Sequence, residues 1–223
     1  MIEFINVSKR FNDLEVLNNF NIRFEKDKIT CLFGPSGVGK TTIANIAANL
    51  TEADNGKVIR DKSAVYSFVF QEPRLLEWYS VYDNIDFVLK NVYDYDKRVN
   101  TIQNYIDMVE LSGFESYKPK ELSGGMAQRV SLARAFAYPS NVLILDEPFK
   151  GLDVKLKREM IAMFKKLWNE SKRTVLFITH DVDEAATLSD YIYILKENPA
   201  KIIDYINISR YNDIAEVKNH LDI

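Results

Sequence analysis

The chain has 223 residues, 47% of them hydrophobic and 27% charged, and its formal net charge is −3. This length and composition allow one large globular domain, or two small joined ones, with a full-sized core. The mild acidity argues against nucleic-acid binding, which usually requires a strongly basic face. No apolar run reaches the ~18 residues of a membrane-spanning helix, so we expect a soluble chain whose link to any membrane is a partner protein.

The first residues, MIEFINVSKRF, alternate apolar and polar side chains like a strand and lack the long apolar core of a signal peptide. The single cysteine, Cys31, excludes an intrachain disulfide and is consistent with a reducing cytosol. Because it lies in the apolar run ITCLFG, we expect a buried strand residue and not a reactive thiol.

Strand-like and helix-like runs alternate along the chain. Strands are predicted at 2–7, 19–24, 28–33, 57–59, 64–70, 141–146, 174–180, 191–195 and 201–206. Helices are predicted at 41–50, from Ser123 onward, at 153–170 and at 183–188, and a mainly helical region spans 80–117. This alternation predicts a parallel sheet covered on both faces, with the region 80–117 inserted as a helical subdomain. The stretch from about residue 209 is a modest amphipathic tail.

The run GPSGVGKTT follows a predicted strand, precedes a predicted helix and satisfies the phosphate-loop pattern G-x-x-x-x-G-K-[ST]. Its glycines let backbone N–H groups approach phosphate oxygens without an intervening Cβ. Lys40 supplies a positive charge for the β- and γ-phosphates, and the Thr41 hydroxyl is placed to ligate Mg²⁺. The expected nucleotide site is Gly34, Pro35, Ser36, Gly37, Val38, Gly39, Lys40, Thr41 and Thr42.

Two acids follow the apolar strand VLIL, at the carboxyl end where ligands bind in parallel sheets. Asp146 is expected in the Mg²⁺ shell, and Glu147 as the base that polarises a water for in-line attack on the γ-phosphate. Two acids at a strand end are also common as a solvated turn or a helix cap, and the phosphate loop favours the catalytic interpretation. His180 ends another apolar strand, where an imidazole can bond the γ-phosphate and orient the water; His220 is expected to be incidental.

A second candidate anion site lies in LSGGMAQRV, Leu122 to Val130. Ser123, Gly124 and Gly125 open a predicted helix, whose free N–H groups and positive dipole end attract an anion. The alternative is that Ser123 only caps the helix and the glycines behind it are flexible.

Six motifs in this order, GPSGVGKT, Gln71 in VFQEP, LSGGMAQR, LDEP, GLD and the histidine of ITHD, resemble the nucleotide-binding subunit of ATP-binding cassette (ABC) transporters. The resemblance extends from about Glu3 to Tyr205. It implies an α/β P-loop NTPase fold, in which a parallel-sheet core carries an antiparallel β subdomain and an inserted α-helical subdomain. It also implies a single domain, 1–223, with a nucleotide-binding core at 1–79 and 139–208, a helical subdomain with the LSGG motif at 80–138 and a tail at 209–223.

The resemblance implies how the second anion site is used. In that family two subunits associate head to tail, so that each LSGG segment closes over the ATP of the other subunit. The residues expected to contact the partner's nucleotide in trans are Ser123, Gly124, Gly125, Gln128 and Asp153.

Three further roles follow from the resemblance. Phe11 matches the aromatic residue that stacks on adenine, although it also fits as an ordinary apolar residue at a strand end. Val16 matches a neighbour that packs on the nucleotide. Gln71 matches a residue that ligates Mg²⁺, takes part in catalysis and senses the membrane subunit.

The region after Gln71 is expected to receive a transmembrane partner. Its spacing of Trp78, Tyr82 and Ile85 gives one helical face, which fits either a docking groove for a permease's coupling helix or internal core. QEPRLLEW resembles the QEPRLLPW of the nitrate, sulfonate and taurine importer branch, with Glu77 in place of proline. The GLD motif also departs from the family, since Lys150 and Gly151 stand where a small residue and alanine are commoner.

The expected function is therefore that of a peripheral ATPase on the cytoplasmic face of the membrane, with ATP and Mg²⁺ as cofactors. Its expected partners are a second copy or a sister cassette, permease subunits and, indirectly, a substrate-binding protein, but no nucleic acid. The alternative is a soluble ABC-type ATPase acting on ribosomes or DNA, a class that usually has two cassettes or a long coiled-coil insertion. A P-loop kinase or GTPase would leave the LSGG motif and Gln71 unexplained.

Overall fold

The structure is a computed structural model that describes residues 1–221, and these residues form two compact units. The first unit contains residues 1–66, 141–147 and 172 onward, and the second contains 67–140 and 148–171. Among the described residues, no helix combines the length and the apolar character needed to cross a bilayer.

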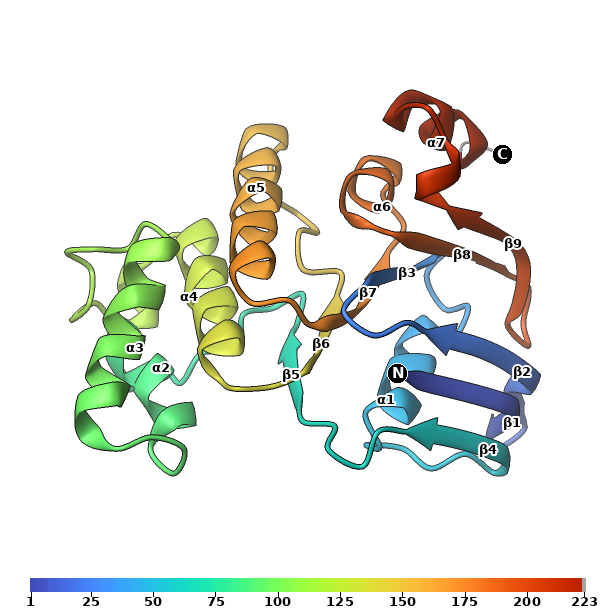
Figure 1. The fold of residues 1–223 in the computed structure, drawn as a ribbon, viewed down its shortest axis with the longest axis horizontal. Coiled ribbons are helices and arrows are strands. Elements are labelled where there is room, and N and C mark those ends of the chain that lie inside the picture. Colours follow the sequence, from blue (N-terminus) through green and yellow to red (C-terminus); the bar gives the residue numbers. More distant parts are fainter. Residues whose placement is uncertain (222–223) are drawn as a thin grey trace. The chain divides into compact units, whose positions relative to one another are not determined.

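A mainly parallel sheet lies at the centre of the first unit (Figure 1). Its strands follow the order β6 (Val142–Asp146), β7 (Thr174–Thr179), β3 (Ile29–Phe33), β8 (Tyr191–Lys196) and β9 (Lys201–Asn207). β6, β7 and β3 are buried along almost their whole length and run parallel to one another. Their carboxyl ends therefore meet at one edge, where ligands bind in such sheets.

The last strand departs from the expected parallel pattern. β9 runs antiparallel to β8, with Ile192 opposite Ile206. Only residues 197–200 join the two strands, whereas a parallel connection needs a crossover of about a dozen residues or more. The sheet therefore ends in a hairpin on this side.

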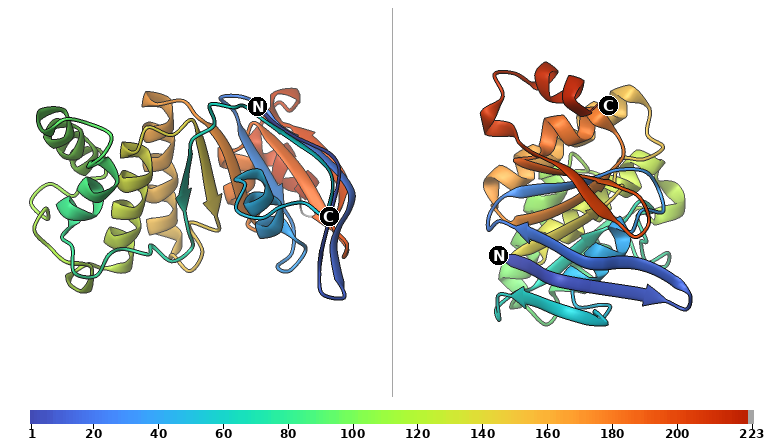
Figure 2. Two further views of the ribbon diagram at one scale, coloured as in Figure 1. Left: turned by 90° about the horizontal axis from the view of Figure 1, so that it is seen from below. Right: turned by 90° about the vertical axis from the view of Figure 1, so that its right-hand side faces the viewer.

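An antiparallel sheet and helices cover the two faces of this central sheet. β1 (Ile2–Phe11) lies between β2 (Leu14–Phe24) and β4 (Asn55–Arg60). This sheet and α1 (Lys40–Ala47) lie on one side, and α6 (Val182–Leu188) and α7 (Ile214–Leu221) lie on the other (Figures 1 and 2). The expected α/β core with an antiparallel β subdomain is thus confirmed.

The C-terminal tail is a docked helix. α7 follows a short 3₁₀ turn, Ile208–Arg210, and buries Val217 completely. Lys218 pairs with Asp183 of α6 at 2.5 Å. His220 Nε2 lies 2.6 Å from Asp204 Oδ2, and this hydrogen bond lowers the pKa of the Asp204 carboxyl. His220 is therefore a structural residue that fixes the tail, a role that the sequence analysis did not specify.

The second unit is built around α4 (Gly124–Ala137). α4 packs against α2 (Val81–Leu89), α3 (Tyr95–Met108) and α5 (Val154–Glu170). Because neighbours cover it on several sides, α4 is buried around most of its circumference rather than along one stripe. Its buried residues include Val130, Leu132 and Phe136, and the ring of Phe136 packs edge-on against Phe164 of α5 at 5.7 Å. β5 (Tyr66–Val69) and the 3₁₀ turn Pro119–Glu121 precede α4 in the chain.

The buried thiol of Cys31 gives a first prediction. Cys31 has no exposed surface in the middle of β3, and burial raises the pKa of its thiol far above the usual range. Because only the thiolate reacts, we expect the native protein at pH 7 to resist an aromatic disulfide reagent. The urea-unfolded chain should react through its single cysteine and release one equivalent of the reagent's aromatic thiol. Equal rates for the native and unfolded protein would show that β3 is not a stable part of the core.

Candidate functional site

The loop between β3 and α1, residues 34–39, is shaped by contacts that leave no room for side chains. A Cβ at Gly34 would lie 2.4 Å from the carbonyl oxygen of Leu195, and one at Gly39 would lie 2.9 Å from Cγ1 of Val16. Gly39 also has a φ of 103°, which favours glycine, and it provides no side-chain cap for α1. No side chain therefore caps the first turn of α1, and a helix start of this kind suits an anion.

Lys40 places a positive charge inside this loop. It is the first residue of α1 and only 5% exposed. Its Nζ donates hydrogen bonds to the carbonyl oxygens of Gly34 and Pro35, at 2.6 and 2.7 Å. The ammonium is therefore held against the backbone that would surround a phosphate.

Thr41 and Asp146 bring two hard oxygen ligands together. The Thr41 hydroxyl donates to Asp146 Oδ2 at 3.1 Å, which joins the start of α1 to the end of β6. Among residues 1–221, no cluster of three or more histidine, cysteine, aspartate or glutamate side chains could hold a metal. A cation here would need water or phosphate oxygens in addition, and this is how Mg²⁺ is usually bound.

Glu147 and His180 meet at the same sheet edge. Glu147 Oε1 lies 3.3 Å from His180 Nδ1, and the two side chains are 12% and 48% exposed. Glu147 adopts a φ of 46°, a conformation that costs a non-glycine residue about 1–3 kcal/mol and is common at functional sites. Its N–H donates to the carbonyl of Ile178 at 3.0 Å, which fixes the turn after β6 against β7.

Phe11 and Val16 lie on either side of the β1–β2 turn. Phe11 is 46% exposed, and the Lys9 ammonium lies 5.2 Å from its ring centroid. An exposed ring of this kind can stack on a planar group. Val16 is buried and approaches Gly39, so it contacts the end of the phosphate loop, next to the start of α1. Their roles toward a nucleotide remain predictions.

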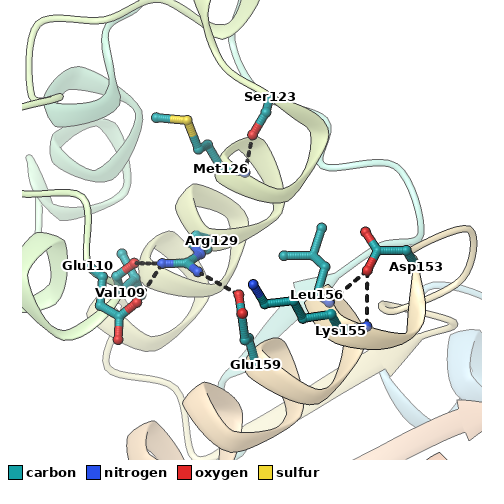
Figure 3. Close-up of polar contacts among 9 residues, drawn as sticks. All are labelled: Val109, Glu110, Ser123, Met126, Arg129, Asp153, Lys155, Leu156 and Glu159. Atoms are coloured by element: carbon teal, nitrogen blue, oxygen red, sulfur yellow. Dashed lines mark hydrogen bonds and ion pairs between the residues drawn. The ribbon is translucent and has the colours of Figure 1, made fainter.

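In the second unit, Ser123 is the N-cap of α4 (Figure 3). Its Oγ accepts the N–H of Met126 at 3.2 Å. This bond occupies one N–H of the first turn, and Gly124 and Gly125 follow as the first residues of the helix. The cap that the sequence offered as an alternative is therefore present, and the anion-binding role stays a prediction.

Two other residues expected to act in trans have bonds within the chain. Asp153 is the N-cap of α5, and its Oδ1 accepts the N–H groups of Lys155 and Leu156, both at 3.0 Å (Figure 3). Gln128 is 3% exposed, and its Nε2 donates to the carbonyls of Phe70 and Pro148 at 3.2 and 2.7 Å. A contact between Gln128 and a partner's nucleotide would require this amide to leave both carbonyls.

Gln71 is exposed in the loop that follows β5, and its role stays a prediction. Sequence reasoning missed the residue that holds this loop. Arg134 of α4 donates from Nη1 to the carbonyl of Arg74 at 3.1 Å and from Nη2 to that of Pro73 at 3.0 Å. The arginine carries no motif of its own, so only its place on the buried helix after LSGG could have indicated it.

Comparison with known proteins gives consistent matches. Residues 17–150 match the family described as ABC transporter. The aliphatic sulfonates import ATP-binding protein SsuB of Bacillus cereus is 40% identical over 203 residues, 87% of this chain and 79% of that protein. The sulfate/thiosulfate import ATP-binding protein CysA of Mannheimia succiniciproducens is 36% identical over 220 residues, 92% of this chain and 62% of that protein.

A solved structure agrees with the fold. The ATP-binding cassette MJ0796, determined as a dimer in a post-hydrolysis state with ADP and Pi, is 27% identical, with a TM-score of 0.81 over 93% of this chain and 99% of that one. From its sequence, its relatives and its fold together, the chain belongs to the ABC transporter family.

Proposed function

We propose that this chain is the ATP-binding and ATP-hydrolysing subunit of an importer. In this proposal it works as a head-to-tail dimer on the cytoplasmic face of the membrane, bound to transmembrane permease subunits. The observation that carries the proposal is the meeting of Lys40, the Thr41–Asp146 pair and the Glu147–His180 pair at the carboxyl ends of β3, β6 and β7. A charge for phosphate, a ligand pair for Mg²⁺ and a base with an adjacent imidazole are the parts that phosphoryl transfer to water requires.

Nucleotide binding would use the loop as it stands. The Lys40 ammonium would exchange the carbonyls of Gly34 and Pro35 for β- and γ-phosphate oxygens, which carry more negative charge. The uncapped first turn of α1 would donate its N–H groups to the remaining oxygens. The ring of Phe11 would offer adenine a stacking surface. Mg²⁺ fits the Thr41 and Asp146 oxygens, and when bound it neutralises charge on the phosphates.

Hydrolysis would depend on Glu147. Its carboxylate would accept a proton from a water as the water oxygen attacks the γ-phosphorus and the bond to the bridging oxygen of ADP breaks. His180, 3.3 Å from this carboxylate, would hold the same water by a hydrogen bond. The proton on Glu147 would then pass to the released phosphate.

Dimerisation explains the second anion site. The α4 N-terminus begins with two glycines after Ser123, and a helix start without side chains lets backbone N–H groups approach an anion. In the proposed dimer this anion is the γ-phosphate bound by the partner. The relative solved as a dimer with ADP and Pi supports the association of two cassettes.

An exposed surface in the second unit suits the membrane partner. Trp78 is 82% exposed and, with Glu77, Lys118, Pro119 and Lys120, lines a hollow of about 530 Å³. Exposed tryptophans are frequent anchors of protein interfaces. Relatives named for the import of aliphatic sulfonates and of sulfate or thiosulfate support a small sulfur oxyanion as the cargo, to be selected by a substrate-binding protein and the permease.

The Glu147→Gln variant tests the proposal as a whole. It keeps the size of the side chain but removes the proton acceptor, so we expect hydrolysis to fall by about 10²–10⁴-fold. ATP binding should persist, and light scattering should report a dimer with ATP and Mg²⁺ but a monomer with ADP. Wild-type turnover would reject Glu147 as the base. A variant that binds ATP and stays monomeric would reject the homodimer.

The Ser123→Arg substitution tests the trans role in the Glu147→Gln chain. Ser123 is exposed, so the arginine fits in the monomer and should leave its ATP affinity unchanged. In the dimer it would occupy the place of the partner's phosphate, and no dimer should form. Ser123→Thr keeps the capping hydroxyl and serves as the matched control, which should still dimerise. Dimerisation of the arginine variant at the ATP concentration of its parent would reject the trans role.

The Trp78→Ala substitution tests the docking surface. We expect it to lower the affinity for the permease, measured by co-purification, tenfold or more, because an interface anchor contributes about 2 kcal/mol to binding. ATP binding should be unchanged. Tyr95→Ala removes another aromatic side chain of the same unit, 69% exposed and outside the hollow, and should have no effect. Equal losses from both variants would place the permease elsewhere.

A further inference from the structure

Gly125 of α4 faces Leu156 of α5 at a close helix–helix contact. A Cβ at residue 125 would lie 2.8 Å from Cδ2 and 3.0 Å from Cδ1 of Leu156. Side-chain carbons do not approach each other this closely, so any residue larger than glycine would force the leucine, or the helix, to move.

The neighbouring glycine shows that the contact is specific to residue 125. A Cβ at Gly124 would meet no described atom within 4 Å. Neither glycine has a positive φ, so the backbone conformation requires glycine at neither position. Within the part of the subunit that the structure describes, only the side chain of Leu156 requires glycine at residue 125.

A second contact lies one turn further along both helices. Arg129 Nη2 lies 3.5 Å from Glu159 Oε2 of α5. Gly125 and Arg129 are four residues apart on α4, and Leu156 and Glu159 are three apart on α5, so each pair lies on one helix face. Arg129 is only 14% exposed, and its Nη1 also donates to Glu110 at 2.8 Å and to the carbonyl of Val109 at 3.3 Å. The two contacts fix how α4 sits along α5.

The cap of α5 extends this connection to Asp153. The Asp153 carboxylate accepts the N–H of Leu156 itself, at 3.0 Å. At the other end, Gly125 lies in the first turn of α4, two residues after its cap Ser123. Asp153 is thus bonded to the backbone of the residue whose side chain packs against the first turn of α4.

We propose that Leu156 is a positioning residue that sets the orientation of the α4 N-terminus according to the position of Asp153. The inference rests on the proposed function, in which Ser123 binds a phosphate of the partner subunit, and on the sequence-based expectation that Asp153 also contacts the partner. When the partner contacts Asp153 of one subunit, the α4 N-terminus of that same subunit is reoriented toward the ATP bound by the partner. Gly125 is glycine for this packing contact as well as for any approach to phosphate.

A double-mutant cycle in the Glu147→Gln chain tests the proposal. The measured quantity is the ATP concentration that gives half-maximal dimer. We expect Gly125→Ala to raise it about tenfold and Leu156→Ala about threefold, because each disturbs the packing. The double variant should show about the threefold effect of Leu156→Ala alone, since the added methyl then meets no leucine. A product of about thirtyfold would mean that the two residues act independently and would overturn the proposal.

The monomer provides a readout that does not depend on the partner. Without nucleotide, Gly125→Ala should give a lower thermal unfolding midpoint than Gly124→Ala, because both variants gain the helix propensity of alanine but only the first displaces the side chain of Leu156. Gly124→Ala is the matched control and should leave the midpoint unchanged or raise it, because alanine favours the helix. Equal midpoints for the two alanine variants would reject the Gly125–Leu156 contact. If the Glu147→Gln parent itself does not dimerise, the proposed function is rejected, and the positioning role with it. The unfolding midpoints would still show whether residue 125 packs against Leu156.

Discussion

The parallel register of β6, β7 and β3 is the constraint on which the candidate site depends. Asp146 lies beside Ile178, and Phe33 lies beside Thr179. All three strands therefore end at one edge of the sheet. The phosphate loop, the two acids and His180 lie at or directly after these strand ends. Because both faces of these strands are buried, charged residues occur only where the strands end. The same burial that stabilises the sheet thus gathers the polar groups of the site.

This constraint explains how much the sequence could predict. The phosphate loop, Asp146 and Glu147, and His180 each follow an apolar strand, so local patterns place them at the same edge without knowledge of tertiary contacts. Contacts between segments that are far apart in the sequence were harder to predict. The bond between His220 and Asp204 requires α7 to fold back onto β9, and an amphipathic pattern does not say which surface a helix will cover. The antiparallel course of β9 depends on its short connection, which the apolar pattern alone does not reveal.

The second unit shows a different limit. Motif resemblance assigned Ser123, Gln128 and Asp153 to a partner's nucleotide, and the structure gives each of them a bond within its own chain. For Ser123 and Asp153 the two uses are compatible, because a cap occupies one side-chain oxygen and leaves other groups at the helix start. For Gln128 they compete, because the buried amide already donates to two carbonyls. A motif records which residues occur together but not which of their atoms are already bonded.

The two helix starts proposed to bind phosphate differ in a way that fits their different ligands. α1 begins at a glycine with no capping side chain, whereas α4 begins at Ser123, whose hydroxyl accepts an N–H of the first turn. A glycine in place of a capping side chain costs only about a few tenths of a kcal/mol, and bound nucleotide in the same subunit would offset this cost whether or not a partner is present. The anion proposed for α4 arrives only with a second subunit, so α4 must be stable before it comes. The serine supplies that stability, and the glycines behind it keep the remaining N–H groups within reach of the partner's phosphate.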